Sequence, residues 1–248
     1  NVASAGIIAV TGASRGIGAA IAVELARRAF TVACLTRNGR GPESDDAQQY
    51  ARQFVNIACD VTEENSVKTA LASAVRQAGA LNGLVNNAGI HIDGLSHEMP
   101  TAVYEKVMAT NATAVYAACR DAYPYLIANG GGTIVNIGSL YDKLGVKRNL
   151  AYCASKAAVG AITRCLAVEW GGKGIRVLDV APGYIVTDLN RDVLMQGPLA
   201  DYVKKRIPSG AMGSAADVAK LVAAIFGEDI PFLSGETIYI DGAQGVSH

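Results

Sequence analysis

The sequence lacks long apolar runs and blocks of one charge. No uninterrupted apolar stretch approaches the roughly 18 residues of a membrane-spanning helix, so we expect no membrane partner. Lysine and arginine together (22) equal aspartate and glutamate (22). The basic residues form no patch that could follow a phosphate backbone, and we therefore expect no nucleic-acid partner.

Cysteine and histidine are also few and scattered. There are five cysteines without a CxxC pair and three histidines without an HExxH pattern. Wide cysteine spacing and an odd number are typical of reduced thiols. We therefore expect no metal site and a cytoplasmic protein. The first residues contain no charged segment ahead of an apolar run, so a signal peptide is not expected.

What the sequence does contain is apolar residues in short runs. Half of its 248 residues are hydrophobic, enough to bury a full core, which excludes a disordered chain. Seven runs rich in valine and isoleucine lack the alternation of half-buried strands, and therefore predict buried parallel strands. They comprise residues 6–10, 31–36, 54–58, 83–85, 133–137, 175–180 and 237–240.

Segments with helical spacing separate these runs. Ile17, Ile21 and Leu25 recur every four residues in one of them. Seven strands alternating with about six helices predict an α/β fold: a single Rossmann-type domain over residues 1–248, with helices on both faces of a doubly wound parallel sheet. Residues 181–210 show no clear strand pattern, and we expect a ligand-binding loop there, at the carboxyl edge of the sheet.

A glycine-rich segment, TGASRGIG at 11–18, follows the first predicted strand. Glycines permit a tight turn and close approach of a ligand, and the N-terminus of the next helix offers free N–H groups to a pyrophosphate. The spacing is GxxxGxG instead of GxGxxG. The glycines alone would equally suit a plain strand–helix turn, but their position after the first strand favours nucleotide binding.

The segment that follows indicates which dinucleotide is bound. NAD enzymes hold the ribose 2′-OH with a carboxylate about 20 residues beyond the glycines, yet no acidic residue lies between Glu24 and Glu43. Arg37 follows the second strand and could clamp a 2′-phosphate together with Arg15. Arg37 and Arg40 could also be ordinary surface cations. We expect NADP as the cofactor, with NADPH favoured and NAD left open.

A serine, a tyrosine and a lysine form the candidate catalytic group. Ser139 follows the fifth strand, and Tyr152 and Lys156 are four residues apart. On a helix they share one face about 6 Å apart along the axis. A neighbouring ammonium favours the ionised phenol, which makes the tyrosine a usable general acid or base. A YxxxK string alone is more often an exposed pair; the serine and the glycine loop favour catalysis.

Taken in order, these motifs resemble the short-chain dehydrogenases/reductases over essentially the whole chain. The matching strings are TGASRGIG (11–18), CDV (59–61), NNAG (86–89), Asn111, GS (138–139), YCASK (152–156) and PGYIVT (182–187). They are most similar to the 3-oxoacyl-[acyl-carrier-protein] reductase type. The resemblance implies a reversible NADPH-dependent reduction of a ketone to an alcohol. The alternatives are a dehydrogenase of a sugar, polyol or steroid and, less favoured, a non-catalytic dinucleotide-binding regulator.

The resemblance also implies roles for single residues. Tyr152 would exchange a proton with the substrate oxygen, and Ser139 would hydrogen-bond that oxygen. Lys156 would hold the nicotinamide ribose, and Asn111 would support a water that links Lys156 to solvent. Asp60 would meet the adenine, although it could also cap the following helix. The implied cofactor contacts are Gly12, Ser14, Arg15, Gly16, Ile17, Gly18, Arg37, Asp60, Val61, Asn87, Ala88, Gly89, Tyr152, Lys156, Pro182, Gly183, Ile185 and Thr187.

Further expectations concern the substrate and the partners. Lys143, Lys147 and Arg148 lie between Ser139 and Tyr152. They could attract an anionic substrate or an acyl thioester on a carrier protein, or form a solvated loop. His91 follows NNAG and could face the pocket, although a neutral spacer role is favoured. The resemblance implies a homotetramer that uses helices around residues 101–128 and 150–171 and the C-terminal strand.

Overall fold

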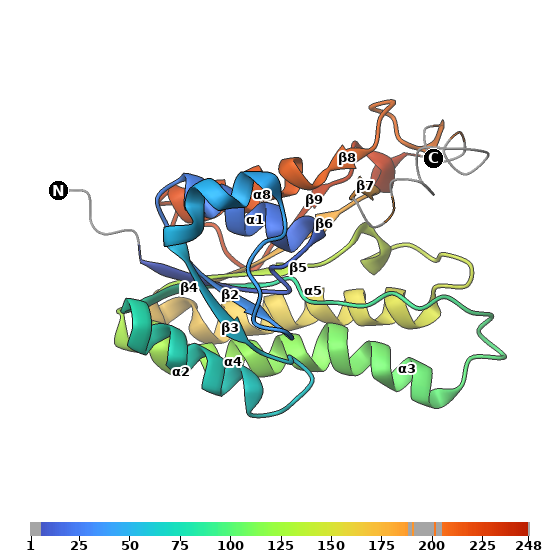
Figure 1. The fold of residues 1–248 in the computed structure, drawn as a ribbon. Helices are drawn as coiled ribbons and strands as arrows, with labels where there is room; N and C mark the ends of the chain where they lie inside the picture. Colours follow the sequence, from blue (N-terminus) through green and yellow to red (C-terminus); the bar gives the residue numbers. More distant parts are fainter. Residues whose placement is uncertain (1–5, 188–189, 191–200, 202–204, 248) are drawn as a thin grey trace.

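The computed structural model describes residues 6–187, 190, 201 and 205–247, which form a three-layer α/β structure (Figure 1). The middle layer is a seven-stranded parallel sheet in the order β3-β2-β1-β4-β5-β6-β9. Its strands are β1 (Ile7–Thr11), β2 (Thr31–Thr36), β3 (Phe54–Ala58), β4 (Leu81–Asn86), β5 (Gly132–Ile137), β6 (Ile175–Pro182) and β9 (Thr237–Ile240). The structure therefore confirms all seven predicted strands and the α/β fold class.

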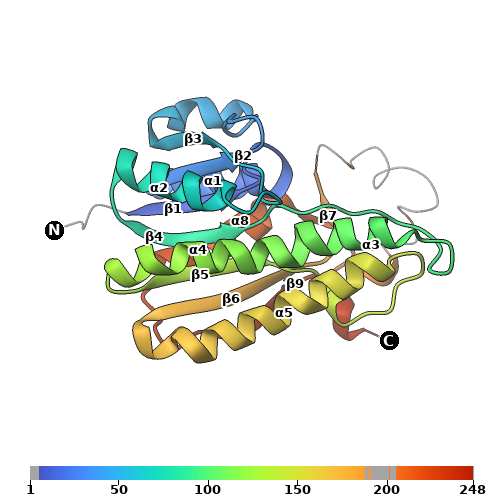
Figure 2. The same ribbon diagram turned by 90° about the horizontal axis from the view of Figure 1, so that it is seen from below.

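Helices cover both faces of this sheet, as the unalternating strands require. Helices α1 (Gly16–Arg27) and α8 (Ala215–Gly227) lie on one face. On the other face lie α2 (Ser66–Ala78), α4 (Ala114–Ala128) and α5 (Leu150–Trp170), seen side by side in Figure 2. Helix α3 (Thr101–Met108) continues into α4 through a π-helical turn, Ala109–Thr113. No helix in the described part of the chain is long and apolar enough to cross a bilayer.

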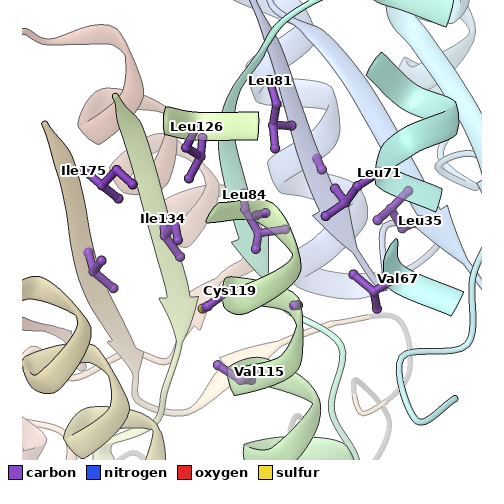
Figure 3. Packing of buried hydrophobic residues seen from close by; sticks show 14 of the residues in the cluster. Leu35, Val67, Leu71, Leu81, Leu84, Val115, Cys119, Leu126, Ile134 and Ile175 are labelled. Atoms are coloured by element: carbon purple, nitrogen blue, oxygen red, sulfur yellow. The ribbon is translucent and has the colours of Figure 1, made fainter. Parts of the chain in front are cut away.

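Two apolar layers hold the helices to the sheet. The layer under α2, α4 and α5 contains Leu71, Leu84 and Ile134, all fully buried (Figure 3). The layer under α1 and α8 contains Val10 and Ile21, likewise buried. Each fully buried aliphatic side chain contributes about 1.5–3 kcal/mol, so the two layers fix the positions of the strand ends.

The prediction of a patternless segment at 181–210 was partly wrong. Strand β6 continues to Pro182, and β7 (Ile185–Val186) pairs in parallel with β8 (Gly213–Ser214). A strand of two residues is too short to show any periodicity, so the sequence carried no signal for it. The rest of that prediction, at 188–189, 191–200 and 202–204, lies outside the described residues.

Candidate active site

The sheet reverses its strand order between β1 and β4, and two of the predicted motifs meet at this point. The backbone amides of Asn87 and Ala88 both donate to the Thr11 hydroxyl at 3.0 Å. The Asn87 side-chain amide donates to the carbonyls of Thr11 (3.1 Å) and Gly12 (3.2 Å). The NNAG string therefore holds the glycine loop in place, at the crevice where ligands bind in doubly wound folds.

The glycine loop forms a cradle that side chains would fill. Gly12 has φ +64° and Gly16 has φ +57°, in the left-handed region that favours glycine. A Cβ on Gly18 would lie 2.2 Å from the Gly12 carbonyl oxygen. Helix α1 begins with no side-chain cap and no acidic residue in its first turn. A turn of this kind fits a pyrophosphate against the helix N-terminus.

The substitution Gly18→Ala is expected to weaken nicotinamide dinucleotide binding at least about tenfold, because overpacking of 1–3 kcal/mol displaces the loop. Isothermal titration with NADPH measures the loss. Gly171→Ala is the matched control, since a Cβ there meets nothing within 4 Å. Equal dissociation constants for the two variants would contradict a cradle shaped by Gly18.

Arg15 and Arg37 follow the carboxyl ends of the neighbouring strands β1 and β2. Strand β1 pairs with β2 up to Thr11 and Leu35, and both arginines are exposed just beyond. Asp60 lies near Arg37: the Thr62 hydroxyl and amide, with a smaller contribution from Arg37, hold the pKa of Asp60 below its ordinary value. The edge therefore presents two exposed guanidinium groups beside the glycine cradle.

The predicted catalytic group surrounds a cavity of about 570 Å³. Ser139, Tyr152 and Lys156 all line it, from the end of β5 and the first turns of α5. The Lys156 ammonium lies 5.5 Å from the centroid of the Tyr152 ring. It is buried and donates to the Ile137 carbonyl oxygen at 2.7 Å. An ammonium has three donors, so Lys156 retains capacity toward the cavity.

Asn111 lies in the π-helical turn between α3 and α4. Its side chain accepts from the Ile90 amide at 2.8 Å and donates to the Ile90 carbonyl at 2.8 Å and to the Ser155 hydroxyl at 3.1 Å. These three bonds tie the chain after β4 to helix α5. A π-turn shifts the backbone hydrogen-bond ladder and is frequent at functional sites.

The structure brings many of the predicted cofactor and catalytic residues together, but not all of them. Those that line the cavity are Ile17, Asn87, Gly89, Ser139, Tyr152, Lys156, Pro182, Gly183, Ile185 and Thr187. Arg15 and Gly16 line an adjoining cavity of about 850 Å³ that shares Thr187. The remainder lie outside both walls: Gly12, Ser14, Gly18, Arg37, Asp60, Val61, Ala88 and Asn111.

Sequence reasoning missed several polar residues of the cavity wall. Tyr141 and Tyr184 line the cavity, with their hydroxyls 2.9 Å apart. Burial, together with Tyr184, raises the pKa of Tyr141 above its ordinary value. His91, assigned a spacer role, lines the cavity edge-on to Tyr152 at 4.9 Å and hydrogen-bonds Asn149. A single tyrosine in an irregular segment carries no spacing that could have marked it, whereas the position of His91 after NNAG did allow a place in the pocket.

The three basic residues expected near the substrate are directed elsewhere. The Lys143 ammonium lies 3.5 Å from the Tyr239 ring centroid. Arg148 forms an ion pair with Asp93 at 3.0 Å. Lys147 is exposed, and none of the three lines the cavity. The solvated-loop alternative therefore fits this segment better than an anionic-substrate site.

Comparisons with known proteins agree with this geometry. A family model described as enoyl-(acyl carrier protein) reductase matches residues 12–245, and the chain belongs to this family of short-chain dehydrogenases/reductases. The family binds a nicotinamide dinucleotide. The chain is 38% identical to 2-(R)-hydroxypropyl-CoM dehydrogenase of Xanthobacter autotrophicus, over 94% of this chain and 96% of that one. It is 34% identical to a 3-oxoacyl-[acyl-carrier-protein] reductase of Haemophilus influenzae, over 97% and 98%.

Solved structures show the same similarity. A short-chain alcohol dehydrogenase described as putative, from Sinorhizobium meliloti, superposes with a TM-score of 0.92 at 29% identity, covering 99% of this chain and 98% of that one. A 2-deoxy-D-gluconate 3-dehydrogenase, also described as putative, from Agrobacterium tumefaciens carries bound NADP. Its TM-score is 0.87 at 30% identity, covering 97% and 96%. The protein is therefore an oxidoreductase of this family.

Proposed function

We propose that the protein is an NADPH-dependent reductase that converts a ketone to a secondary alcohol and runs in reverse as an alcohol dehydrogenase. The observation that carries this proposal is the placement of Ser139, Tyr152 and Lys156 around one cavity beside the glycine cradle. A non-catalytic regulator would have no use for a buried ammonium beside a phenol at such a cavity.

Different residues bind different parts of the cofactor. Bound NADPH supplies the hydride, which is chemistry the protein itself lacks. The glycine cradle holds the pyrophosphate, and Arg15 and Arg37 hold the 2′-phosphate through charge-assisted hydrogen bonds. Lys156 holds the nicotinamide ribose with the donors that the Ile137 carbonyl leaves free. These residues would hold a bound dinucleotide for hydride transfer at the cavity.

The residues of the cavity bind the substrate carbonyl oxygen and transfer the proton to it. Ser139 hydrogen-bonds the substrate carbonyl oxygen and fixes its direction. Tyr152 then donates its phenolic proton to that oxygen as negative charge develops there, and Lys156 stabilises the phenolate left behind. Asn111, through its π-helical turn, supports a water that returns a proton from solvent by way of Lys156. In the oxidative direction each of these transfers is reversed.

The cavity wall bears on the substrate class. Tyr141, Tyr184 and His91 place two hydroxyls and an imidazole in the cavity wall, with His91 and Tyr141 next to Tyr152. Such a wall satisfies the polar groups of a small hydroxylated ketone better than an alkyl chain. A sugar or polyol dehydrogenase is therefore the second candidate, and relatives named glucose 1-dehydrogenase (36% identical) and gluconate 5-dehydrogenase (31% identical) accord with it.

A substrate panel with NADPH and NADH in parallel tests the proposed function. The panel comprises an acetoacetyl thioester, a small diketone and keto sugars, with oxidation of NADPH followed by absorbance. We expect carbonyl-dependent oxidation of NADPH, with turnover on a keto sugar exceeding that on the thioester. Absence of turnover across the panel in both directions would overturn the proposal.

We also propose a cytoplasmic homotetramer. Side chains on the outer helices support the assembly: Tyr116 on α4 and Leu150 and Val168 on α5 are large, apolar and exposed. Apolar side chains exposed on neighbouring helices are typical of subunit interfaces.

A further inference from the structure

A row of polar side chains crosses the otherwise apolar sheet face under α5. Asn86, Asn136, Asp179 and Thr237 pair in register on the adjacent strands β4, β5, β6 and β9. Asn86 donates to Asn136 at 2.9 Å, and Thr237 donates to the Asp179 carboxylate at 3.1 Å. The same face carries leucine, isoleucine and valine elsewhere, so this row is a local exception.

Asp179 is the one ionisable member of this row. It is 0% exposed, and its Oδ1 has no hydrogen-bond partner in the described structure. A Cβ on Gly138 would lie 2.4 Å from that oxygen, and one on Gly160 would lie 3.9 Å from Oδ2. Burial raises the pKa of Asp179 to about 6, while the Thr237 hydroxyl, the Lys156 ammonium and, least, the Gly138 backbone amide oppose the rise. A buried carboxylate with an unpaired oxygen costs stability, and packing gives no reason for it.

The carboxylate lies behind the catalytic lysine. Lys156 and Gly160 are one turn apart on α5, facing the sheet, and Gly160 borders the Asp179 carboxylate. The Lys156 ammonium donates to the Ile137 carbonyl, and the next residue, Gly138, leaves the space that the carboxylate fills. The Lys156 ammonium is thus 5.5 Å from the centroid of the Tyr152 ring, and Gly138, directly after β5, and Gly160, on α5, both border the Asp179 carboxylate.

We propose that Asp179 is a positioning residue whose carboxylate partly balances the Lys156 charge and so sets the pH range in which Tyr152 exchanges its proton. The proposal rests on the proposed function of this site. A positive charge beside a phenol favours its ionised form, and a carboxylate close to that charge weakens its field. Removing the carboxylate leaves the ammonium uncompensated, so the phenolate forms at lower pH.

Two other charged groups face Asp179 and contribute to the electrostatic potential around it. Asp142, at the 3₁₀ turn Leu140–Asp142, accepts from the Tyr239 hydroxyl of β9 at 2.7 Å. Asp142 adds to the rise in the pKa of Asp179. Arg164 of α5 lies beside Gly160, whose added Cβ would be 3.4 Å from its guanidinium. Both charged groups remain in an Asp179 variant, so its replacement changes one charge only.

The test compares Asp179→Asn with Asp229→Asn, which removes the same charge from an exposed loop near the start of β6. The readout is kcat/KM for alcohol oxidation against pH. For Asp179→Asn we expect the rising limb to move to lower pH by about half to one unit, the effect of one charge at short range inside a protein. Asp229→Asn should leave the limb unmoved. An unmoved limb in Asp179→Asn would overturn the proposal.

A second arm needs no turnover and separates this proposal from the proposed function. In the cofactor-free protein the Tyr152 phenolate is followed by ultraviolet absorbance, as the difference from Tyr152→Phe. We expect the phenolate to form at lower pH in Asp179→Asn than in the wild type, even if no substrate is found. Coincident titrations would overturn the proposal while leaving the oxidoreductase assignment untouched.

The variant is expected to fold. The pKa of Asp179, about 6, lies above its ordinary value of 3.8, so the buried carboxylate costs stability above about pH 6 and the cost disappears as pH falls toward 3.8. Asp179→Asn should therefore melt higher than the wild type at pH 8 and approach it at pH 4. Should it fail to fold, Thr237→Val keeps the carboxylate and removes its donor. Loss of this donor raises the pH at which Asp179 ionises. We therefore expect the rising limb of the kcat/KM profile to change slope at a higher pH than in the wild type, and an unchanged profile would overturn the proposal.

Discussion

Replacing Tyr152 by phenylalanine is expected to lower kcat/KM for ketone reduction about 10³-fold, the middle of the range for loss of a general acid. The variant loses one oxygen and keeps its ring, which packs edge-on against His91 at 4.9 Å and Tyr141 at 5.9 Å. The cavity therefore keeps its shape while its proton donor is gone. Steady-state oxidation of NADPH measures the loss.

The control for this prediction is a phenol in the same cavity that is not the donor. Tyr184→Phe removes a hydroxyl whose partner is Tyr141, 2.9 Å away. We expect it to lower kcat/KM less than about tenfold, the cost of one neutral hydrogen bond. Tyr184→Phe should bind NADPH like the wild type. Retention of more than a tenth of the activity in Tyr152→Phe would contradict the assignment of the proton donor.

The second large effect concerns cofactor preference. The double variant Arg15→Ala, Arg37→Ala is expected to reduce the preference for NADPH over NADH at least about 10²-fold in kcat/KM. Each arginine is exposed at the carboxyl edge of β1 or β2, and each charge-assisted hydrogen bond to the 2′-phosphate is worth about 1.5–3 kcal/mol. Because NADH lacks this phosphate, its kinetics should change little.

Arg40 provides the matched control for the cofactor prediction. It is exposed in the same turn after β2, where its backbone carbonyl accepts from the Thr36 hydroxyl at 2.8 Å. Arg40→Ala should change the NADPH/NADH ratio less than about threefold, as expected for a surface cation outside the phosphate site. An unchanged ratio in the double variant would show that the arginines do not read the 2′-phosphate.

The fold could be predicted largely because its central strands are buried on both faces. Runs such as Thr31–Thr36 are short and largely apolar and are followed by the polar residues Arg37 and Asn38, which is a strong local signal. The polar row escaped prediction for the opposite reason. Asn136 and Asp179 are far apart in sequence, and only the register of β5 on β6 brings them side by side.

The site was predictable where spacing carries geometry. Tyr152 and Lys156 share a helix face because they are four residues apart, and both line the cavity as expected. Tyr141 and Tyr184 lie in irregular segments, where position depends on packing between distant turns. Asn87 was expected to line the nucleotide site, and its side chain also secures the glycine loop, which spacing alone does not indicate.

The most direct test follows deuterium from NADPH that carries deuterium at both C4 positions of its nicotinamide into the product of the best ketone found. The account predicts one deuterium on the carbinol carbon of the alcohol in the wild type, and almost none of this product with Tyr152→Phe. An alcohol without deuterium on its carbinol carbon, or an alcohol formed equally well by Tyr152→Phe, would contradict it.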